Sequence, residues 1–222
     1  MSAFFATHGV TGWLATTITA NQADIDAAVL AAQQNQQTQT PQTARAQLLG
    51  LHLEGPYLNA KWCGAQDTSY IRPANPAEYE AWFASGLVKL ITIAPEVAPA
   101  NAALLDYAIA HGATVALGHT DCTYAQAKAF FERGANQSTH TFNAMRGLHH
   151  REPGLVGAAV GRAAPRRLGG QVEVALADGL AVAVRAGFEE LAVLAHRHGR
   201  HSARETAPEN PAHHLGRPRW RR

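Results

Sequence analysis

Three side chains with metal-ligating atoms, Glu54, His119 and His140, stand at or near the ends of short apolar runs. The runs have the length of buried strands and are rich in small and β-branched residues. Parallel strands of one sheet present their carboxyl ends at the same edge, so these side chains would share that edge. One carboxylate and two neutral imidazoles suit Zn²⁺ or Fe²⁺ with a coordination position left for water. The pattern therefore predicts a divalent-metal site.

A metal site of this kind would make hydrolysis of an amide feasible. A bound divalent cation lowers the pKa of water toward neutrality and polarises a carbonyl oxygen. Each of the three residues taken alone is better explained as a loop residue, a helix cap or a hydrogen-bonded core side chain. Their occurrence at three strand ends favours a metal site, although many α/β proteins carry unrelated polar residues at such positions.

Alternating strands and helices would position these side chains. The expected strands are 13–18, 48–53, 88–94, 114–118 and 137–141, and the expected helices are 21–31, 77–85, 101–111 and 123–133. The glutamine-rich stretch 33–47 is interpreted as an exposed helix end followed by a surface connection. The order βαβαβαβαβ predicts repeated βα units, in either a parallel barrel or an open doubly wound sheet.

Length and composition permit a sizeable core. The chain has 222 residues, of which 46% are apolar, enough for one α/β domain or part of a larger one. Cys63 and Cys122 are far apart and form no C-x-x-C pair, which argues against a disulfide framework or a thiolate metal site and favours a reducing cytoplasm. The first residues lack a basic segment and a continuous apolar run, so we expect neither a signal peptide nor a membrane span.

The carboxyl-terminal part of the sequence is rich in arginine. Residues 161–222 contain 11 arginines and 6 acidic residues, whereas acidic residues are in excess over residues 1–160. Arginine-rich segments can bind nucleic acid or acidic membranes. No aromatic stacking platform or known reader motif accompanies these arginines, so we expect a solvated segment, with no nucleic-acid and no membrane partner.

Five phrases of the sequence resemble N-acetylglucosamine-6-phosphate deacetylases, a family of the amidohydrolase superfamily. They are HLEGPYLN at 52–59, KWCGAQD at 61–67, ALGHTDCTYAQAKAFFERGA at 116–135, STHTFNAM at 138–145 and HHREPGLVGAA at 149–159. The resemblance covers approximately residues 5–160 and implies an α/β fold, a partial (β/α)8 TIM barrel of the metal-dependent amidohydrolase type. It also implies a hydrolase that removes acetate from N-acetylglucosamine 6-phosphate to give glucosamine 6-phosphate, in amino-sugar catabolism.

The resemblance assigns roles to particular positions. Carried over residue by residue, it implies that Glu54, His119 and His140 hold the metal, with Zn or Fe as the cofactor. It places the sugar phosphate and hydroxyls near five residues, Ala65, Gln66, Asn143, Ala144 and Arg151.

Arg151 also carries an implication for assembly. In similar enzymes the corresponding arginine can reach a neighbouring subunit's site, which implies a homodimer. A guanidinium fork suits a phosphate dianion. The alternative is a surface ion pair between Arg151 and Glu152 or another acid.

The sequence departs from the family pattern at both ends. Relatives begin before the counterpart of Met1, and beyond residue 160 they continue with an ADGxH segment and a strand ending in Thr-Asp-Ala, whose aspartate is the catalytic acid or base. Here Ala181 replaces that histidine, and no Thr-Asp-Ala occurs. We therefore identify no catalytic acid or base, because Asp178 cannot simply take the place of that aspartate.

These departures set the expected domains and the alternatives for function. We expect a partial barrel over 1–160, followed by an arginine-rich segment over 161–222 that lacks family resemblance and is disordered or frame-altered. The loss of resemblance indicates an altered reading frame or a truncated gene product. The first alternative is an inactive fragment that at most binds metal or sugar phosphate. The second is an amidohydrolase acting on another N-acyl amino sugar.

Overall fold

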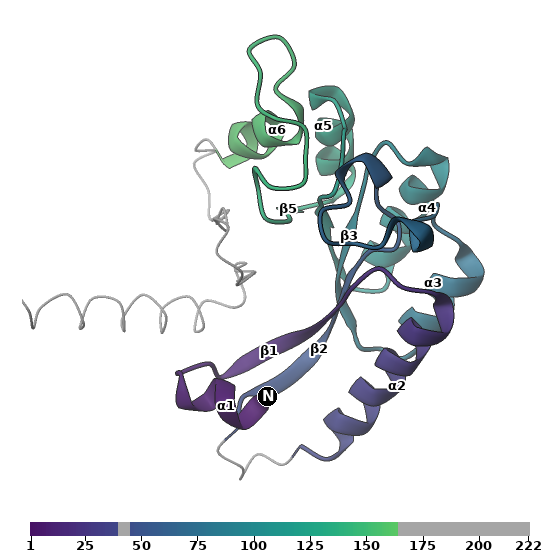
Figure 1. Cartoon of the computed structure of the whole chain (residues 1–222), viewed down its shortest axis with the longest axis vertical. Helices are drawn as coiled ribbons and strands as arrows, with labels where there is room; N and C mark the ends of the chain where they lie inside the picture. The colour runs from purple at the N-terminus through teal and green to yellow at the C-terminus, as the bar shows by residue number, and fades with distance from the viewer. Residues whose placement is uncertain (40–44, 164–222) are drawn as a thin grey trace, which may run out of the picture.

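Five parallel strands form one sheet in the computed structural model, which describes residues 1–39 and 45–163 (Figure 1). The strands are β1 (Gly12–Thr17), β2 (Gln47–Glu54), β3 (Val88–Ile93), β4 (Thr114–Leu117) and β5 (Gln137–Ser138). Their order in the sheet is their order in the sequence, and each neighbouring pair is parallel. A doubly wound sheet reverses its strand order at a switch point, whereas a barrel adds each strand beside the last. The described sheet therefore has the order of a parallel barrel.

Helices connect the strands and cover the sheet. The α-helices are α1 (Ser2–Thr7), α2 (Gln22–Gln37), α3 (Pro76–Ala84), α4 (Ala98–Ala110), α5 (Tyr124–Arg133) and α6 (Gly154–Ala163), and two 3₁₀ helices, η1 (Ala60–Trp62) and η2 (Thr68–Tyr70), lie in the loop after β2. Each of α2 to α5 joins one strand to the next. Figure 1 shows α2, α3 and α4 along one side of the sheet. No helix of the described residues is both long and apolar enough to cross a bilayer.

The main core lies between the sheet and these helices. Leu53, Ile93 and Leu117 come from three different strands and are fully buried. Trp82 of α3 and Leu104 of α4 belong to the same apolar cluster. Complete burial of a large apolar side chain contributes roughly 1.5–3 kcal/mol. This core fixes the strands and, with them, the positions of the strand ends.

The predicted alternation of strands and helices is confirmed, with differences at the boundaries. Helix α4 begins at Ala98 rather than at 101, and Pro99 suits its first turn because proline needs no backbone donor there. Strand β5 has two residues rather than the five expected over 137–141, because the backbone leaves the extended conformation at His140, where φ is 30°. Helices α1 and α6 were not predicted.

Two expectations concern residues outside the described ranges. The surface connection proposed for the glutamine-rich stretch includes residues 40–44, and the arginine-rich segment includes 164–222, with Asp178 and Ala181. Helix α6 continues past the expected boundary at residue 160 to Ala163, the last described residue. The division into a partial barrel and a separate segment stays a prediction.

Candidate metal centre

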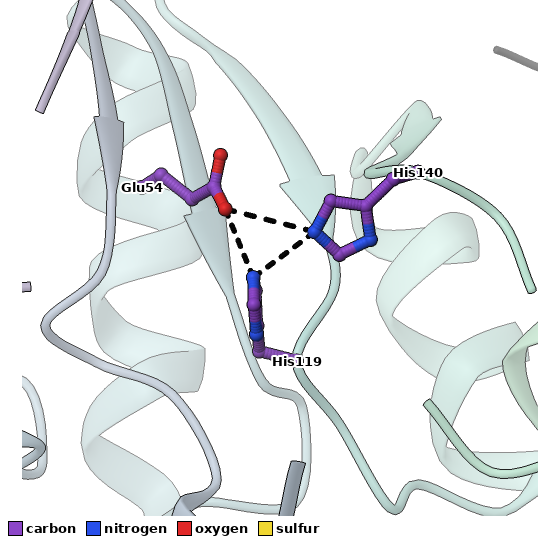
Figure 2. A group of neighbouring side chains, drawn as sticks. All are labelled: Glu54, His119 and His140. Carbon is purple, nitrogen blue, oxygen red and sulfur yellow. Dashed lines mark hydrogen bonds and ion pairs between the residues drawn. The ribbon is translucent and has the colours of Figure 1, made fainter. Parts of the chain in front are cut away.

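The three predicted ligands converge at the carboxyl edge of the sheet. Glu54 is the last residue of β2, and His119 and His140 each lie two residues beyond the ends of β4 and β5. The Nε2 atom of His119 is 2.9 Å from Glu54 Oε1 and 3.0 Å from His140 Nε2, and His140 Nε2 is 3.6 Å from Glu54 Oε1. Figure 2 shows the three polar tips pointing toward one another. Elements distant in the sequence therefore bring these residues into one cluster, as the strand-end pattern predicted.

Backbone carbonyls orient both imidazoles. His119 Nδ1 lies 2.8 Å from the carbonyl oxygen of Trp62, and His140 Nδ1 lies 3.0 Å from that of Asn143. A carbonyl oxygen only accepts hydrogen bonds, so each Nδ1 must carry the proton that is donated. In the neutral ring the other nitrogen, Nε2, then has no proton. Both Nε2 lone pairs therefore face the centre of the cluster.

This arrangement places three acceptors together and suits a cation. With both rings neutral, the two Nε2 atoms and the Glu54 carboxylate offer lone pairs to one another and no proton to share. A divalent cation bound between them would satisfy all three, and one ligand atom from each residue lies within 4.8 Å of the others. Outer hydrogen bonds that fix the ring tautomer are typical of metal-binding histidines. The residues present therefore fit a divalent metal.

The electrostatics of the cluster without a metal follow from the same contacts. Burial would raise the pKa of the Glu54 carboxyl, but its hydrogen bonds with His119 and His140 lower that pKa far below the usual range. Burial acts to lower the pKa of His140, whereas the hydrogen bond and the charge of Glu54 raise it, with a net increase. A proton on His140 thus stabilises the carboxylate when no cation is bound.

Both histidines occupy a strained backbone conformation. His119 has φ of 47° and His140 has φ of 30°, in the left-handed region that side-chain-bearing residues rarely adopt. Such conformations cost on the order of 1–3 kcal/mol each and persist where the surroundings impose them. The backbone N–H of Asn59 donates to the carbonyl of His119 over 2.9 Å, and that of Asn143 donates to the carbonyl of His140 over 2.8 Å.

A buried chain of hydrogen bonds lies beside the cluster and was not predicted. His52 Nε2 is 2.8 Å from Thr92 Oγ1, which is 2.8 Å from Thr139 Oγ1. Burial lowers the pKa of His52 to about 4, which keeps this imidazole neutral. His52 is two residues before Glu54 on β2, and alternate strand residues share a face. That spacing was the available signal, since it places His52 on the face that carries the ligand.

Gln66 contacts a predicted ligand. Its side-chain oxygen accepts the backbone N–H of Thr19 over 2.7 Å, and its amide nitrogen donates to Glu54 Oε1 over 3.2 Å. The side chain is buried, whereas the neighbouring Ala65 is exposed. The structure thus adds an orienting contact on Glu54 to the substrate role that the resemblance implied for Gln66.

The remaining predicted substrate residues follow His140 in the sequence and are exposed or half-buried. Asn143 is exposed and Ala144 half-buried in the loop that follows His140. Arg151 is exposed, and its backbone N–H donates to His149 Nδ1 over 3.2 Å. Their roles toward a sugar phosphate stay predictions.

The alternative partner proposed for Arg151 has other contacts. Within the described residues no ion pair joins Arg151 to Glu152. The Glu152 carboxylate instead accepts the backbone N–H of Tyr124 over 2.6 Å and that of Gly154 over 3.1 Å. Glu152 therefore stabilises the starts of α5 and α6.

Known proteins share this fold and sequence. No family model matches the chain. The N-acetylglucosamine-6-phosphate deacetylase of Vibrio furnissii is 42% identical over 163 residues, which are 72% of this chain and 40% of that protein. The N-acetylgalactosamine-6-phosphate deacetylase of Escherichia coli O157:H7 is 38% identical over 157 residues, 70% of this chain and 41% of that protein. The chain therefore spans about 40% of the length of these relatives.

Solved structures agree with the sequence comparison. The N-acetyl-D-glucosamine-6-phosphate deacetylase of Mycobacterium smegmatis superposes with a TM-score of 0.64 at 35% identity, over 70% of this chain and 40% of that one. A mutant of that enzyme has been solved in complex with N-acetyl-D-glucosamine-6-phosphate. Fold and site together define the described part of the chain as part of an amidohydrolase-type barrel. Within that class, the chain is related to part of the N-acetylglucosamine-6-phosphate deacetylases, which confirms the resemblance found in its motifs.

Proposed function

We propose that this chain carries the metal centre of a hydrolase that removes acetate from N-acetylglucosamine 6-phosphate, in the amino-sugar catabolism of the cytoplasm. Glu54, His119 and His140 would hold a divalent cation, Zn²⁺ or Fe²⁺. The observation that carries the proposal is the convergence of one carboxylate oxygen and two imidazole Nε2 atoms, whose rings are oriented by carbonyl oxygens at Nδ1. The cytoplasmic location is supported by Cys63 and Cys122, which are free thiols.

The chain's own residues would bind and orient the reactants. When bound, the cation would supply Lewis-acid polarisation of the amide carbonyl and activation of water. Gln66 would hold the Glu54 carboxylate toward the centre through its 3.2 Å hydrogen bond. The loops that carry Ala65, Asn143 and Ala144 would contact the sugar beside the metal.

Arg151 would bind the substrate's phosphate through its guanidinium. An exposed arginine retains its charge and offers a planar set of donors to phosphate oxygens. We propose that it serves the site of a second copy of the chain, so that the working assembly is a homodimer. Sedimentation of the purified chain, with and without the Arg151→Ala substitution, would measure that assembly independently of phosphate binding.

A second N-acyl amino sugar is a candidate substrate. The relative from Escherichia coli O157:H7 is named a deacetylase of N-acetylgalactosamine 6-phosphate and is nearly as similar to this chain as the relative from Vibrio furnissii. The two sugars differ in the orientation of one hydroxyl. Comparison of both phosphorylated sugars in one assay would identify the preferred substrate.

Binding without turnover is the other candidate. The sequence contains no Thr-Asp-Ala segment, which in the family contains the catalytic acid or base. A positioned acid or base contributes a factor of roughly 10² to 10⁴ to such a reaction. On this alternative the chain binds the metal and the sugar phosphate but releases acetate slowly or not at all.

The decisive experiment uses the full 222-residue chain. Zn²⁺ or Fe²⁺ would be added, and acetate release measured from N-acetylglucosamine 6-phosphate, N-acetylgalactosamine 6-phosphate and unphosphorylated N-acetylglucosamine. Glu54→Gln serves as the matched control because it keeps the side chain's size while removing its charge. Metal binding would be measured in parallel by competition with a chromogenic chelator.

The outcomes separate the candidates. Metal-dependent release that needs the 6-phosphate and disappears in Glu54→Gln supports the deacetylase. Metal and sugar-phosphate binding without release supports the inactive form. Equal metal affinity of the parent chain and Glu54→Gln would contradict the assignment of the site.

A further inference from the structure

We propose that Glu96 is a positioning residue for the metal centre, which holds the loops around His119 in their ligating arrangement. This inference rests on the proposed metal site but concerns a residue outside the ligand set. Glu96 lies three residues after the end of β3. Because β3 lies between β2 and β4 in the sheet, the loop after it runs between the strand of Glu54 and the strand of His119.

The Glu96 carboxylate joins segments from two other strand ends. Its Oε1 accepts the side-chain N–H of Asn59 over 2.8 Å, from the loop after β2, and also the backbone N–H of Asp121. Its Oε2 accepts the hydroxyl of Thr120, which is completely buried. One side chain thus receives three hydrogen bonds from the loops that follow β2 and β4. Hydrogen bonds to a carboxylate are stronger than those between neutral groups.

These partners directly control the backbone of His119. Asn59 donates its own backbone N–H to the carbonyl oxygen of His119 over 2.9 Å, and Thr120 is the next residue in the chain. Glu96 therefore binds both Asn59, which donates to the His119 carbonyl, and Thr120, which follows His119 in the chain. The left-handed φ of 47° at His119 needs such support, because a side-chain-bearing residue left unrestrained would relax to another conformation.

The same contacts extend to the second histidine. The backbone N–H of Thr120 donates to the carbonyl of Ala144 over 3.3 Å, and the N–H of Arg146 donates to the carbonyl of Thr120 over 3.1 Å. Ala144 and Arg146 belong to the loop that follows His140. Thr120, fixed by Glu96, therefore connects the two histidine-bearing loops and sets the separation of their imidazoles.

Loss of the carboxylate should weaken metal binding more than it weakens the fold. Removal of an outer partner of a metal site typically reduces metal affinity 10–100-fold. We expect a loss in that range for Glu96→Ala. Glu96→Gln should recover much of it, because the amide oxygen can accept from Asn59 and Asp121 while the amide nitrogen donates to the hydroxyl of Thr120.

The test is the Zn²⁺ affinity of the full chain, measured by chelator competition, together with the visible absorption spectrum of the Co²⁺ form. Glu80→Ala, at an exposed position of α3, controls for the lost charge. Val29→Ala, on the buried face of α2, controls for lost stability. The expected result is weakened Zn²⁺ binding and an altered Co²⁺ spectrum in Glu96→Ala alone, with recovery in Glu96→Gln.

Two results would overturn the inference. If Val29→Ala loses as much metal affinity as Glu96→Ala at a similar melting temperature, the effect is general destabilisation. If Glu96→Ala binds Zn²⁺ like the parent chain, Glu96 does not position the site. If the parent chain binds no Zn²⁺, the metal centre itself is refuted. If the parent chain binds Zn²⁺ and Glu96→Ala binds it equally well, only the Glu96 proposal fails.

Discussion

At the scale of single residues, the proton positions decide what the cluster can bind. The carbonyls of Trp62 and Asn143 hold the Nδ1 protons of the two neutral histidines, so the Nε2 lone pairs face the centre of the cluster. The same two imidazoles with reversed tautomers would present N–H groups to the centre and would exclude a cation. The metal-binding capacity of the site therefore depends on backbone geometry outside the ligand set.

The buried His52 gives a prediction about pH. Its pKa is lowered to about 4 in the folded chain, against 6.5 for an ordinary histidine. Between pH 4 and 6.5 the unfolded chain therefore binds a proton at His52 that the folded chain does not. The stability of the metal-free protein should fall as the pH is lowered from 6.5 to 4. The full effect is on the order of 3 kcal/mol at 1.36 kcal/mol per pKa unit. Urea unfolding at several pH values, compared with His52→Gln, measures it.

The neighbouring ligands contribute little within the upper part of this window. The raised pKa of His140 stabilises the fold below pH 6.5, and that contribution is lost only as the pH rises above it. The depressed pKa of Glu54 gives a constant stabilisation above pH 4.5, and this stabilisation is lost only as the pH falls below that value. The exposed His8→Asn substitution is the control. Equal pH slopes for the parent chain and His52→Gln between pH 4.5 and 6.5 would refute the prediction.

The clustering of Glu54, His119 and His140 could be predicted from the sequence, whereas the residues that support the cluster could not. Glu54 and His119 immediately follow strand-like runs, so their shared edge is visible in the pattern. Gln66 and Glu96 act through loop conformations that bring distant segments together, and no local periodicity encodes such contacts.

At the scale of elements, helix α5 connects the two strands whose ends carry the histidines. It begins with a capping box, in which the Thr123 side chain accepts the backbone N–H of Gln126 and the Gln126 side chain accepts that of Thr123. We expect Thr123→Ala to reduce the free energy of unfolding by about 1 kcal/mol, because the backbone N–H of Gln126 loses the hydroxyl that accepts it. Thr123→Ser should remain close to the parent in the same urea titration. An unchanged midpoint for Thr123→Ala would show that the box contributes nothing.

The junction between β4 and the His119 loop gives a second prediction at this scale. A Cβ atom on Gly118 would lie 2.7 Å from the Cβ of Thr139, which is too close for two carbon atoms. We expect Gly118→Ala to cost about 1–3 kcal/mol, as overpacking does, and to weaken Zn²⁺ binding by moving the two histidine loops apart. Chemical denaturation and chelator competition would measure the two effects.

Gly147 provides the matched control for that substitution. A Cβ atom there would meet nothing within 4 Å, and its φ lies outside the left-handed region. Gly147→Ala should therefore leave both stability and metal affinity nearly unchanged. If Gly118→Ala behaved in the same way, the close approach of the two loops would not constrain the site.

The elements were predictable where the apolar period was regular. Strands β1 to β4 and helices α2 to α5 were expected close to their observed positions. The short β5 was predicted too long, because its sequence remains strand-like while the left-handed conformation at His140 ends the pairing. That conformation is imposed by tertiary contacts at the site, so strand propensity could not reveal it.

At the scale of the whole molecule, the proposed cation would link three strands of the sheet. Glu54, His119 and His140 belong to the ends of β2, β4 and β5, with β3 enclosed between them. The core on the helix side holds these strands by apolar packing, while the cluster itself places three acceptors together. A bound cation would therefore satisfy all three acceptors at once and stabilise the folded arrangement.

This linkage predicts that stability depends on metal concentration. A ligand that binds only the folded state at 100 times its Kd adds about 2.7 kcal/mol to the free energy of unfolding. We expect the melting temperature of the chain to rise with added Zn²⁺ and to fall when a chelator removes it. Thermal unfolding followed by circular dichroism over a series of Zn²⁺ concentrations measures the effect.

The Glu54→Gln variant determines whether this stabilisation comes from the proposed centre. Its side chain keeps nearly the same size but lacks the negative charge that balances the cation, so Zn²⁺ should raise its melting temperature much less than that of the parent chain. Mg²⁺ at the same concentration tests specificity, because it prefers oxygen ligands in an octahedral arrangement over imidazoles. Equal stabilisation of both chains by Zn²⁺ would place the bound cation elsewhere in the molecule.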